Sequence, residues 1–347
     1  MKYSRVYIES VGYELAPIVV TSTELESRLK PIYEKLRISP GQLETLTGIR
    51  ERRWWKPGTP ISEGAIAAAK KSLQERNISP KDIGAVIYAG VCREHLEPAT
   101  ACQVAAAIGV NGAAAVYDIS NACLGILNGV LDIANRIELG QIRAGLVVAC
   151  ESSREINEIT IKKMLDNPSM DLFTKSLATF TGGSGAAAVL LTDGSFSPSR
   201  RPKLLGGVNI AEPEHHTLCR WGVRSEATAS HVPYMETDAV AVMKYGVELG
   251  KKTWNALLKE LTLTTERINK VICHQVGDAH QKLILQTLGV SPEKDFTTYE
   301  FLGNMGTVSL PVTAALAKER DFLLPGDMVG FLGIGSGLNC LMLGIQW

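Results

Sequence analysis

Apolar and polar positions form two successive series of buried runs and amphipathic stretches. In the first series, residues 61–76 have the period of an amphipathic helix, and four apolar runs predict buried strands, at 82–90, 115–119, 144–150 and 185–192. In the second series, residues 239–261 predict the long helix, and further runs predict strands at 268–274, 296–301, 328–332 and 339–345. Strands that alternate with helices and are apolar on both faces are typical of an α/β layered fold.

The two series follow the same order, which indicates an internal duplication. A helix ends in Ile108-Gly109-Val110 in one half and in Leu288-Gly289-Val290 in the other, and turns at Cys123 and Asn304 follow at similar distances. We therefore predict two βαβαβαββ halves, residues 1–195 and 196–347, packed back to back in a five-layer αβαβα sandwich. A single doubly wound sheet with accidental similarity is the alternative.

Composition excludes several classes of function. Lys plus Arg equals Asp plus Glu, at 36 each, so no net charge attracts nucleic acid or a membrane surface. The seven cysteines include no CxxC pair, which predicts reduced thiols in the cytoplasm and no metal site. The apolar segment 328–347 is interrupted by glycines and Asn339, which favours buried strands over a membrane helix. The N-terminus does not resemble a signal peptide.

Cys123 lies between the predicted strand 115–119 and a helical pattern that starts at Leu124. The N-terminus of a helix has unpaired N–H groups and the positive end of a dipole, which favour a thiolate by at most about 2 kcal/mol. We expect this effect to lower the pKa of the thiol by a little over one unit. Cys123 is therefore a candidate nucleophile that needs no metal.

Two further side chains could act with this thiol. His274 follows a predicted strand, and the carboxyl ends of strands are where α/β sheets place their sites. Asn304 lies on a turn between glycines and offers a neutral amide donor, worth about 3 kcal/mol to a developing oxyanion. A core or capping histidine and a simple turn asparagine are the alternatives. The other five histidines are expected to be surface or structural residues.

Two glycine-rich segments differ in what they predict. In Gly333-Ile334-Gly335-Ser336-Gly337, the backbone N–H groups near Ser336, together with that of Cys123, could form a second oxyanion site. A plain connection between strands is the alternative. Residues 181–185 are interpreted as a tight structural turn. Neither segment is a dinucleotide or phosphate-binding motif, so no nucleotide cofactor is predicted.

Four motifs together carry a family resemblance. They are Thr47-Gly48-Ile49-Arg50, Asn121-Ala122-Cys123-Leu124-Gly125, His274-Gln275 and Gly303-Asn304-Met305-Gly306. This set resembles the β-ketoacyl-acyl-carrier-protein synthase III branch of the thiolase superfamily. The resemblance implies the thiolase fold, a homodimer and Claisen condensation through an acyl-cysteine on Cys123. It also implies that His274 and Asn304 bind the oxygen of the enolate.

Residues 91–101 narrow this resemblance. They resemble a loop of the members of that branch that join two fatty acyl-CoA molecules head to head in bacterial olefin biosynthesis, giving a β-keto acid without loss of carbon dioxide. The resemblance implies that Glu97 reaches across the dimer into the partner's active site as base. An acyl thioester that does not lose carbon dioxide needs such a base to remove its weakly acidic α-proton. Glu94 is the second choice, and a solvated loop is the alternative for both.

The sequence does not determine how CoA is bound. The synthase III family often places a tryptophan and an arginine before the Thr-Gly-Ile-Arg motif to hold CoA, and both are missing here. Arg50, Arg53 and Trp54 are the tentative CoA-binding residues. The predicted function is non-decarboxylative condensation of two acyl-CoA thioesters, with no other cofactor. The alternatives are a decarboxylating synthase III that uses malonyl-acyl carrier protein, a non-catalytic subunit of a heterodimer, or an acyltransferase to oxygen or nitrogen.

Overall fold

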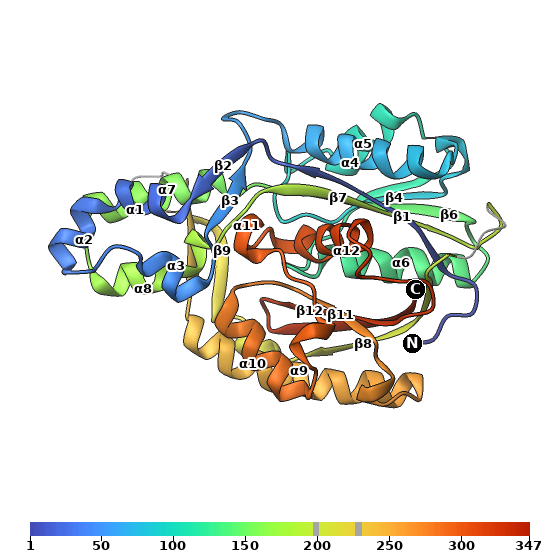
Figure 1. The fold of residues 1–347 in the computed structure, drawn as a ribbon. Helices are drawn as coiled ribbons and strands as arrows, with labels where there is room; N and C mark the ends of the chain where they lie inside the picture. Colours follow the sequence, from blue (N-terminus) through green and yellow to red (C-terminus); the bar gives the residue numbers. More distant parts are fainter. Residues whose placement is uncertain (111, 197–200, 226–230) are drawn as a thin grey trace.

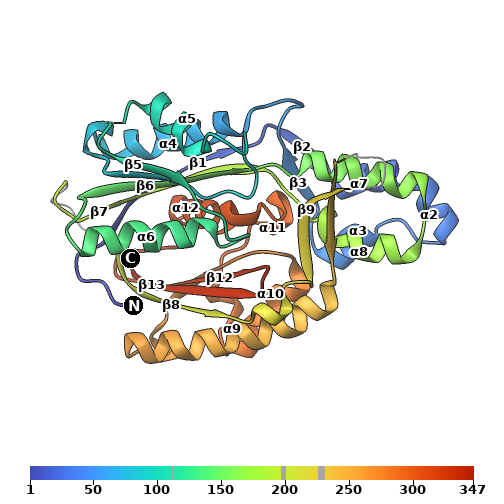
Figure 2. The same cartoon turned by 180° about the vertical axis from the view of Figure 1, so that it is seen from behind.

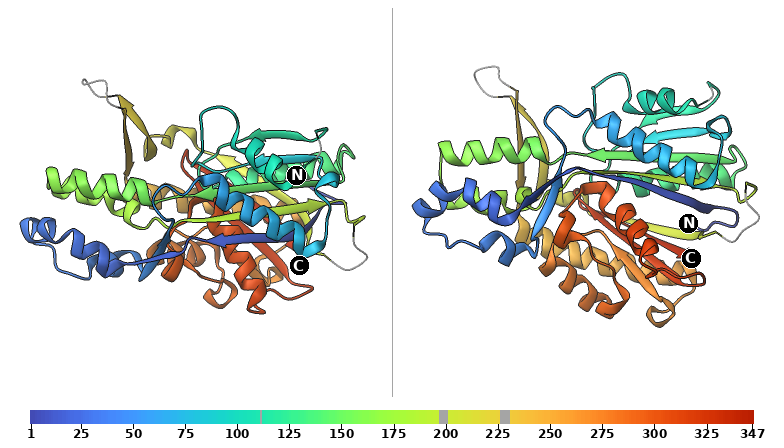
Figure 3. Two further views of the ribbon diagram at one scale, coloured as in Figure 1. Left: turned by 90° about the horizontal axis from the view of Figure 1, so that it is seen from above. Right: turned by 45° about the horizontal axis from the view of Figure 1, so that its top comes forward.

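Five alternating layers of helices and sheets form the body of the molecule, seen edge-on in Figure 1. The computed structural model describes residues 1–110, 112–196, 201–225 and 231–347. A helical lobe extends from one end of the body, and Figure 3 shows it from two further directions. The predicted five-layer sandwich is confirmed.

The large sheets contain β1 (Tyr7–Leu15), β4 (Ala85–Tyr88), β5 (Ala115–Asp118), β6 (Ala144–Glu151), β7 (Gly185–Thr192), β8 (Lys203–Ala211), β11 (Lys270–Cys273), β12 (Met328–Gly335) and β13 (Asn339–Gln346). The helices of the body are α4 (Ile61–Arg76), α5 (Thr100–Ile108), α6 (Gly125–Glu138), α9 (Ala239–Leu261), α10 (Asp278–Leu288), α11 (Tyr299–Leu302) and α12 (Ser309–Glu319). The lobe contains α1 (Ser22–Arg28), α2 (Lys30–Leu36), α3 (Gln42–Thr47), α7 (Arg154–Asp166) and α8 (Met170–Phe180). Two small antiparallel pairs link lobe and body, β2 (Ile18–Thr21) with β3 (Glu51–Trp54) and β9 (Cys219–Ser225) with β10 (His231–Thr237).

The strands divide into two sheets that correspond to the two halves of the chain. Hydrogen bonding connects them in the order β11-β12-β13-β8-β1-β7-β6-β4-β5, and the pair Tyr7–Lys203 is the join between β8 and β1. Strands β1 and β4 to β7 form one layer, and β8 and β11 to β13 form the other (Figure 1). Whether the boundary at 195/196 separates independent folding units stays a prediction.

Apolar side chains on both faces of each sheet explain the layering. Every residue of β6 and β7 is buried, as their continuous apolar runs predict. Helices α4 and α5 cover the outer face of the first sheet, α9 and α10 cover the second, and α6 and α12 fill the space between them (Figure 2). Since both sheets need the central helices to bury their inner faces, the two halves are packed into one unit.

One predicted strand is wrong. Residues 296–301 lead into the short helix α11 and form no strand in the described structure, and the isolated bridge Val271–Asp295 lies just before them. The reason is a side chain: Gln275 Oε1 accepts hydrogen bonds from the N–H groups of Thr298 and Tyr299, both at 2.7 Å. Those N–H groups are therefore not available to a neighbouring strand.

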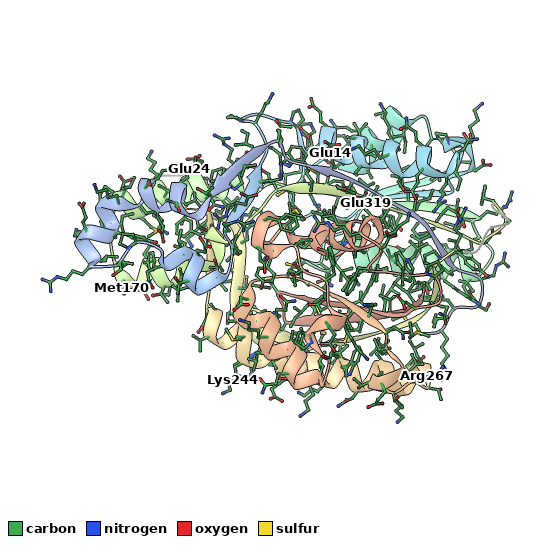
Figure 4. The ribbon with its side chains drawn as sticks, viewed as in Figure 1. Glu14, Glu24, Met170, Lys244, Arg267 and Glu319 are labelled. Carbon is green, nitrogen blue, oxygen red and sulfur yellow. The ribbon has the colours of Figure 1, made fainter. Side chains whose placement is uncertain are left out.

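Charged side chains cover the outer surface of the layers. Figure 4 shows Lys244 and Arg267 beside the outer helices of the second sheet, Glu14 on the side of the first sheet, and Glu319 at the end of α12. Met170, at the start of α8, is 50% exposed at the lobe. No helix in the described ranges is both long enough and apolar enough to cross a membrane.

The start of α6 is packed too closely for any side chain at Gly125. A Cβ built on Gly125 would lie 2.0 Å from the carbonyl oxygen of Ala89, after β4. We expect Gly125→Ala to lower the free energy of unfolding by about 1–3 kcal/mol, because the helix must move away from the sheet. Gly112→Ala is the matched control, since its Cβ would meet open space. Urea denaturation of both variants measures the difference, and equal stabilities would contradict this account.

Candidate active site

Cys123 occupies a strained turn directly before α6. Ala122, the residue before it, has a φ of 45°, which is unusual for a residue with a side chain. The N–H group of Leu124 bonds to the carbonyl oxygen of Asn121 at 2.8 Å, and the Asn121 amide donates to Asn128 Oδ1 at 2.8 Å. These bonds fix the turn, so the half-buried Cys123 side chain is held at the N-terminus of the helix, as predicted.

The turn that carries Asn304 meets the same helix end. Its residue Thr307 accepts a hydrogen bond at Oγ1 from the N–H group of Ile126, at 2.7 Å. Asn304 Oδ1 accepts from the N–H group of Gly306 at 3.0 Å, which leaves its amide nitrogen as the donor that can face a ligand. Residues 181–185, interpreted above as a structural turn, hold the Asn304 turn in place. The N–H group of Asn304 donates to the carbonyl oxygen of Thr181, and the N–H group of Gly183 donates to the carbonyl oxygen of Asn304, both at 2.9 Å.

His274 faces the central layer from the second half. It follows β11, and its N–H group bonds to Leu332 of β12 at 2.8 Å. Side chains alternate along a strand: Ile272 packs in the core around α6 and Cys273 packs in the core beneath α9, so His274 turns back toward α6. Its side chain is 4% exposed, and Nδ1 has no hydrogen-bond partner among the described residues. That this imidazole binds a ligand beside Cys123 stays a prediction.

The glycine-rich turn between β12 and β13 also approaches Cys123. A Cβ built on Gly335 would lie 3.4 Å from the backbone nitrogen of Cys123. The Asn339 amide donates to Asn121 Oδ1 at 3.3 Å and to the carbonyl oxygen of Ser336 at 3.2 Å, which ties this turn to the nucleophile's turn. The predicted proximity of Ser336 and Cys123 is thus observed, and their role as an oxyanion site stays a prediction.

The resting thiol differs from the sequence-based expectation. Burial raises the pKa of Cys123 from 9.0 to about 12, and the nearby Cys219 thiol and Glu151 carboxylate raise it further. A rise of this size outweighs the roughly 2 kcal/mol that a helix terminus supplies at most. The expected lowering of the pKa is therefore wrong for the resting protein, because desolvation of the thiolate dominates.

The imidazole at the site is neutral. Burial, followed by the charge of His280, lowers the pKa of His274 from 6.5 to about 3. Burial likewise lowers the pKa of His280 to about 4. His280 was interpreted as surface or structural, yet it lies close enough to His274 to affect its charge. Two uncharged imidazoles at neutral pH act as hydrogen-bond groups rather than as cations.

The loop with the predicted base points away from its own chain. Glu97 is exposed, and the adjacent Leu96 is 99% exposed. Glu94, the second choice, accepts a hydrogen bond at Oε2 from the N–H group of Ser62 at 3.0 Å, in the first turn of α4. Glu94 therefore stabilises a helix terminus. Glu97 is the carboxylate whose position leaves it available to another subunit.

The three tentative CoA ligands have different environments. Arg50 is exposed, whereas Arg53 is half-buried and donates to Ala16 at 3.5 Å. Trp54 is 2% exposed in the core of the lobe, and its Nε1 donates to Gly182 at 3.4 Å. The burial of Trp54 favours a structural role for its ring. Contact of these residues with CoA stays a prediction.

Glu151 and Thr307 belong to the site but were missed in the sequence. Glu151 is 4% exposed and accepts hydrogen bonds from the N–H groups of Val91 and Cys92, at 2.9 and 3.2 Å. Burial raises its pKa from 4.5 to about 7, although these two bonds oppose the shift. An acidic residue at the end of an apolar strand was a usable signal, the same one that identified His274. Thr307 gave no such signal, because its bond joins distant segments.

Comparisons with known proteins identify the family of this chain. The family model "Thiolase, N-terminal domain" matches residues 58–176, and "3-Oxoacyl-[acyl-carrier-protein (ACP)] synthase III C terminal" matches residues 258–347. A protein of Shewanella oneidensis named acyl-CoA:acyl-CoA alkyltransferase is 58% identical over 349 residues, covering 100% of both chains. A protein of Xanthomonas campestris with the same name is 33% identical over 348 residues, also covering 100% of both.

A crystal structure of Xanthomonas campestris OleA, in a cysteine-to-alanine variant, superimposes with a TM-score of 0.93 at 33% identity, covering 100% of this chain and 98% of that one. The chain belongs to the OleA family of the thiolase superfamily. The resemblance inferred from its motifs is confirmed, and the protein is a thiolase-superfamily acyltransferase. Another structure of Xanthomonas OleA, a cysteine-to-serine variant, contains lauric acid and lauroyl-CoA, with a TM-score of 0.93 and 99% and 100% coverage.

The raised pKa of the thiol in this OleA-family site can be tested by alkylation. We expect the rate at which iodoacetamide modifies Cys123 to rise about tenfold per pH unit up to about pH 9, because the thiolate fraction does so below the pKa. No inflection is expected near 6.5, since His274 stays neutral. Peptide mass spectrometry isolates Cys123 from the other thiols, and His274→Asn is the control. A plateau below about pH 8 would contradict the raised pKa.

Proposed function

We propose that this protein condenses two fatty acyl-CoA thioesters head to head without decarboxylation and releases a β-keto acid. The observation that supports it most directly is that the turn of Asn304 and strand β12, the neighbour of the strand that ends before His274, both meet the Cys123 turn at the start of α6, in a chain 58% identical to an acyl-CoA:acyl-CoA alkyltransferase. As the resemblance implies, such a product would be a precursor of long-chain olefins.

The first half-reaction loads the nucleophile. The sulfur of Cys123 attacks the carbonyl carbon of one acyl-CoA, the bond from that carbon to the CoA sulfur breaks, and the thiol proton leaves with CoA. Backbone N–H groups at Cys123 and Ser336 stabilise the oxyanion of this step. The product is an acyl-cysteine on Cys123 and free CoA.

The second half-reaction forms the carbon–carbon bond. Glu97 of the partner subunit takes the α-proton of the second acyl-CoA, while His274 and Asn304 donate hydrogen bonds to the enolate oxygen. The enolate carbon attacks the acyl-cysteine, Cys123 leaves as thiolate, and the proton on the carboxyl group of Glu97 returns to the sulfur. Water then hydrolyses the β-ketoacyl-CoA to the β-keto acid and CoA.

A homodimer is part of this proposal. The tip of the 91–101 loop exposes Leu96 almost fully beside Glu97, an arrangement that an interface with a second copy would cover. Strand β5 lies at the end of the sheet order and pairs with β4 alone within the described part of the sheet, so its other edge can pair with a second chain. Structures of Xanthomonas OleA with a single glutamate or histidine replaced point to the same residue types.

CoA thioesters are the proposed substrates, with no further cofactor, and Arg50 and Arg53 are the proposed contacts for their charged end. We place the protein in the cytoplasm, since all seven cysteines are free.

Purified protein supplied with two equivalents of myristoyl-CoA and no malonyl donor tests the function. We expect a condensed β-keto acid, detected by mass spectrometry, and its ketone after loss of carbon dioxide on heating. No condensed product, with condensation restored by malonyl-acyl carrier protein, would instead identify a decarboxylating synthase III. Absence of an acyl group on Cys123 would identify a non-catalytic subunit.

Removing the base separates the two half-reactions. We expect Glu97→Ala to lower condensation by at least about a hundredfold, because general-base catalysis is lost, while acylation of Cys123 continues at close to the wild-type rate. Glu94→Gln is the matched control on the same loop. Quenched-flow measurement of CoA release gives the acylation rate, and product analysis gives the condensation rate. An unchanged condensation rate in Glu97→Ala would contradict the role of Glu97.

A further inference from the structure

Glu151 is a buried carboxylate at the site for which the reaction steps above have no use. It is the last residue of β6, next to β4 in the sheet, and the loop that carries Glu97 leaves the end of β4. The N–H groups of Val91 and Cys92, the first part of that loop, both donate to the two oxygens of Glu151. The carboxylate therefore holds the loop where it begins.

The other end of the loop is held in the same way. Asp118, the last residue of β5, accepts hydrogen bonds from the N–H groups of Thr100 and Ala101, both at 2.9 Å. Since β5 and β6 flank β4 on its two sides, the carboxylates that end them hold both ends of one loop. Between these anchors lies the exposed tip with Leu96 and Glu97.

Glu151 differs from Asp118 in that it also lies beside the turn that carries Asn304 and near Cys123. A Cβ built on Gly306, in the turn that carries Asn304, would lie 3.4 Å from Cγ of Glu151, and φ of Gly306 is 58°. The carboxylate is also near enough to Cys123 to affect its titration. One side chain thus lies between the nucleophile, the Asn304 turn and the start of the Glu97 loop.

We propose that Glu151 is a positioning residue that holds the Glu97 loop in the conformation that presents the base to the partner subunit. This inference rests on the proposed function, in which Glu97 acts across the dimer. It predicts that Glu151 serves the partner's active site and not its own, although it lies next to its own Cys123.

Glu151→Gln tests the role in the full-length protein. The N–H groups of Val91 and Cys92 donate to different oxygens of Glu151, and an amide replaces one of these oxygens with an NH2 group, so one N–H group would face a donor instead of an acceptor. We expect condensation to fall at least about tenfold, with acylation of Cys123 within about threefold of wild type. Glu155→Gln, an exposed glutamate four residues on, is the matched control. If thermal melting shows that Glu151→Gln does not fold, Glu151→Asp is used in its place, because it keeps the charge but shortens the side chain.

A double-mutant comparison shows whether Glu151 acts through Glu97. Adding Glu151→Gln to Glu97→Ala should reduce condensation no further, because the base is already missing. Additive losses would mean that Glu151 acts by another route, and they would overturn the inference. Condensation at the wild-type rate in Glu151→Gln alone would overturn it as well.

Mixed dimers decide which active site depends on Glu151. Co-expression with two affinity tags gives dimers that pair Glu151→Gln with Cys123→Ala. In these dimers the remaining Cys123 receives Glu97 from the subunit whose loop is intact, so condensation should return to about half the wild-type rate per dimer. No recovery, or acylation that fails together with condensation, would place Glu151 in its own site and overturn the inference.

The pair of Glu97→Ala with Cys123→Ala separates this inference from the proposed function. Recovery in that dimer shows that Glu97 acts across the interface. Failure to recover contradicts the proposed function itself. If the dimer of Glu97→Ala with Cys123→Ala recovers condensation and the dimer of Glu151→Gln with Cys123→Ala does not, the role of Glu151 is overturned and the proposed function stands.

Discussion

The contact between the two halves at the start of α6 is the constraint on which the site depends. The N–H group of Ile126, which a helix leaves unpaired, finds its acceptor in Thr307 of the other half at 2.7 Å. This bond lies three residues after Cys123 on one side and three residues after Asn304 on the other. A displacement between the halves would therefore separate the nucleophile from the amide and break a buried hydrogen bond.

Close backbone contacts also fix the position of the Cys123 turn and the start of α6. Gly125 lies against the carbonyl group after β4 with no room for a side chain, and Gly335 lies in van der Waals contact with the Cys123 turn. The sheets hold α6 from both sides in the central layer. The side chains proposed for catalysis, Cys123 and Asn304, are consequently on turns that buried contacts hold in place, which is what the proposed reaction with two successive substrates requires of them.

Burial at the site has opposite effects on its two kinds of acid–base groups. It keeps the Cys123 thiol and the Glu151 carboxyl protonated to higher pH and keeps the His274 imidazole neutral. A neutral imidazole and a neutral amide donate hydrogen bonds to an enolate without attracting a carboxylate base. The apolar environment that makes the thiol a weaker acid at rest thus suits the condensation step.

The sequence by itself determined the layers and named three candidate site residues. The helices at 61–76 and 239–261 were predictable because their periods reflect burial on one side. The positions of Cys123, His274 and Asn304 at the ends of a strand or helix were predictable from the repeated order, and their roles stay predictions. The strand at 296–301 was not predictable, since the side chain of Gln275 takes its hydrogen bonds. Only tertiary structure decided the pKa of Cys123, the bond to Thr307 and the place of Glu151, because each depends on burial or contact between segments far apart in the chain.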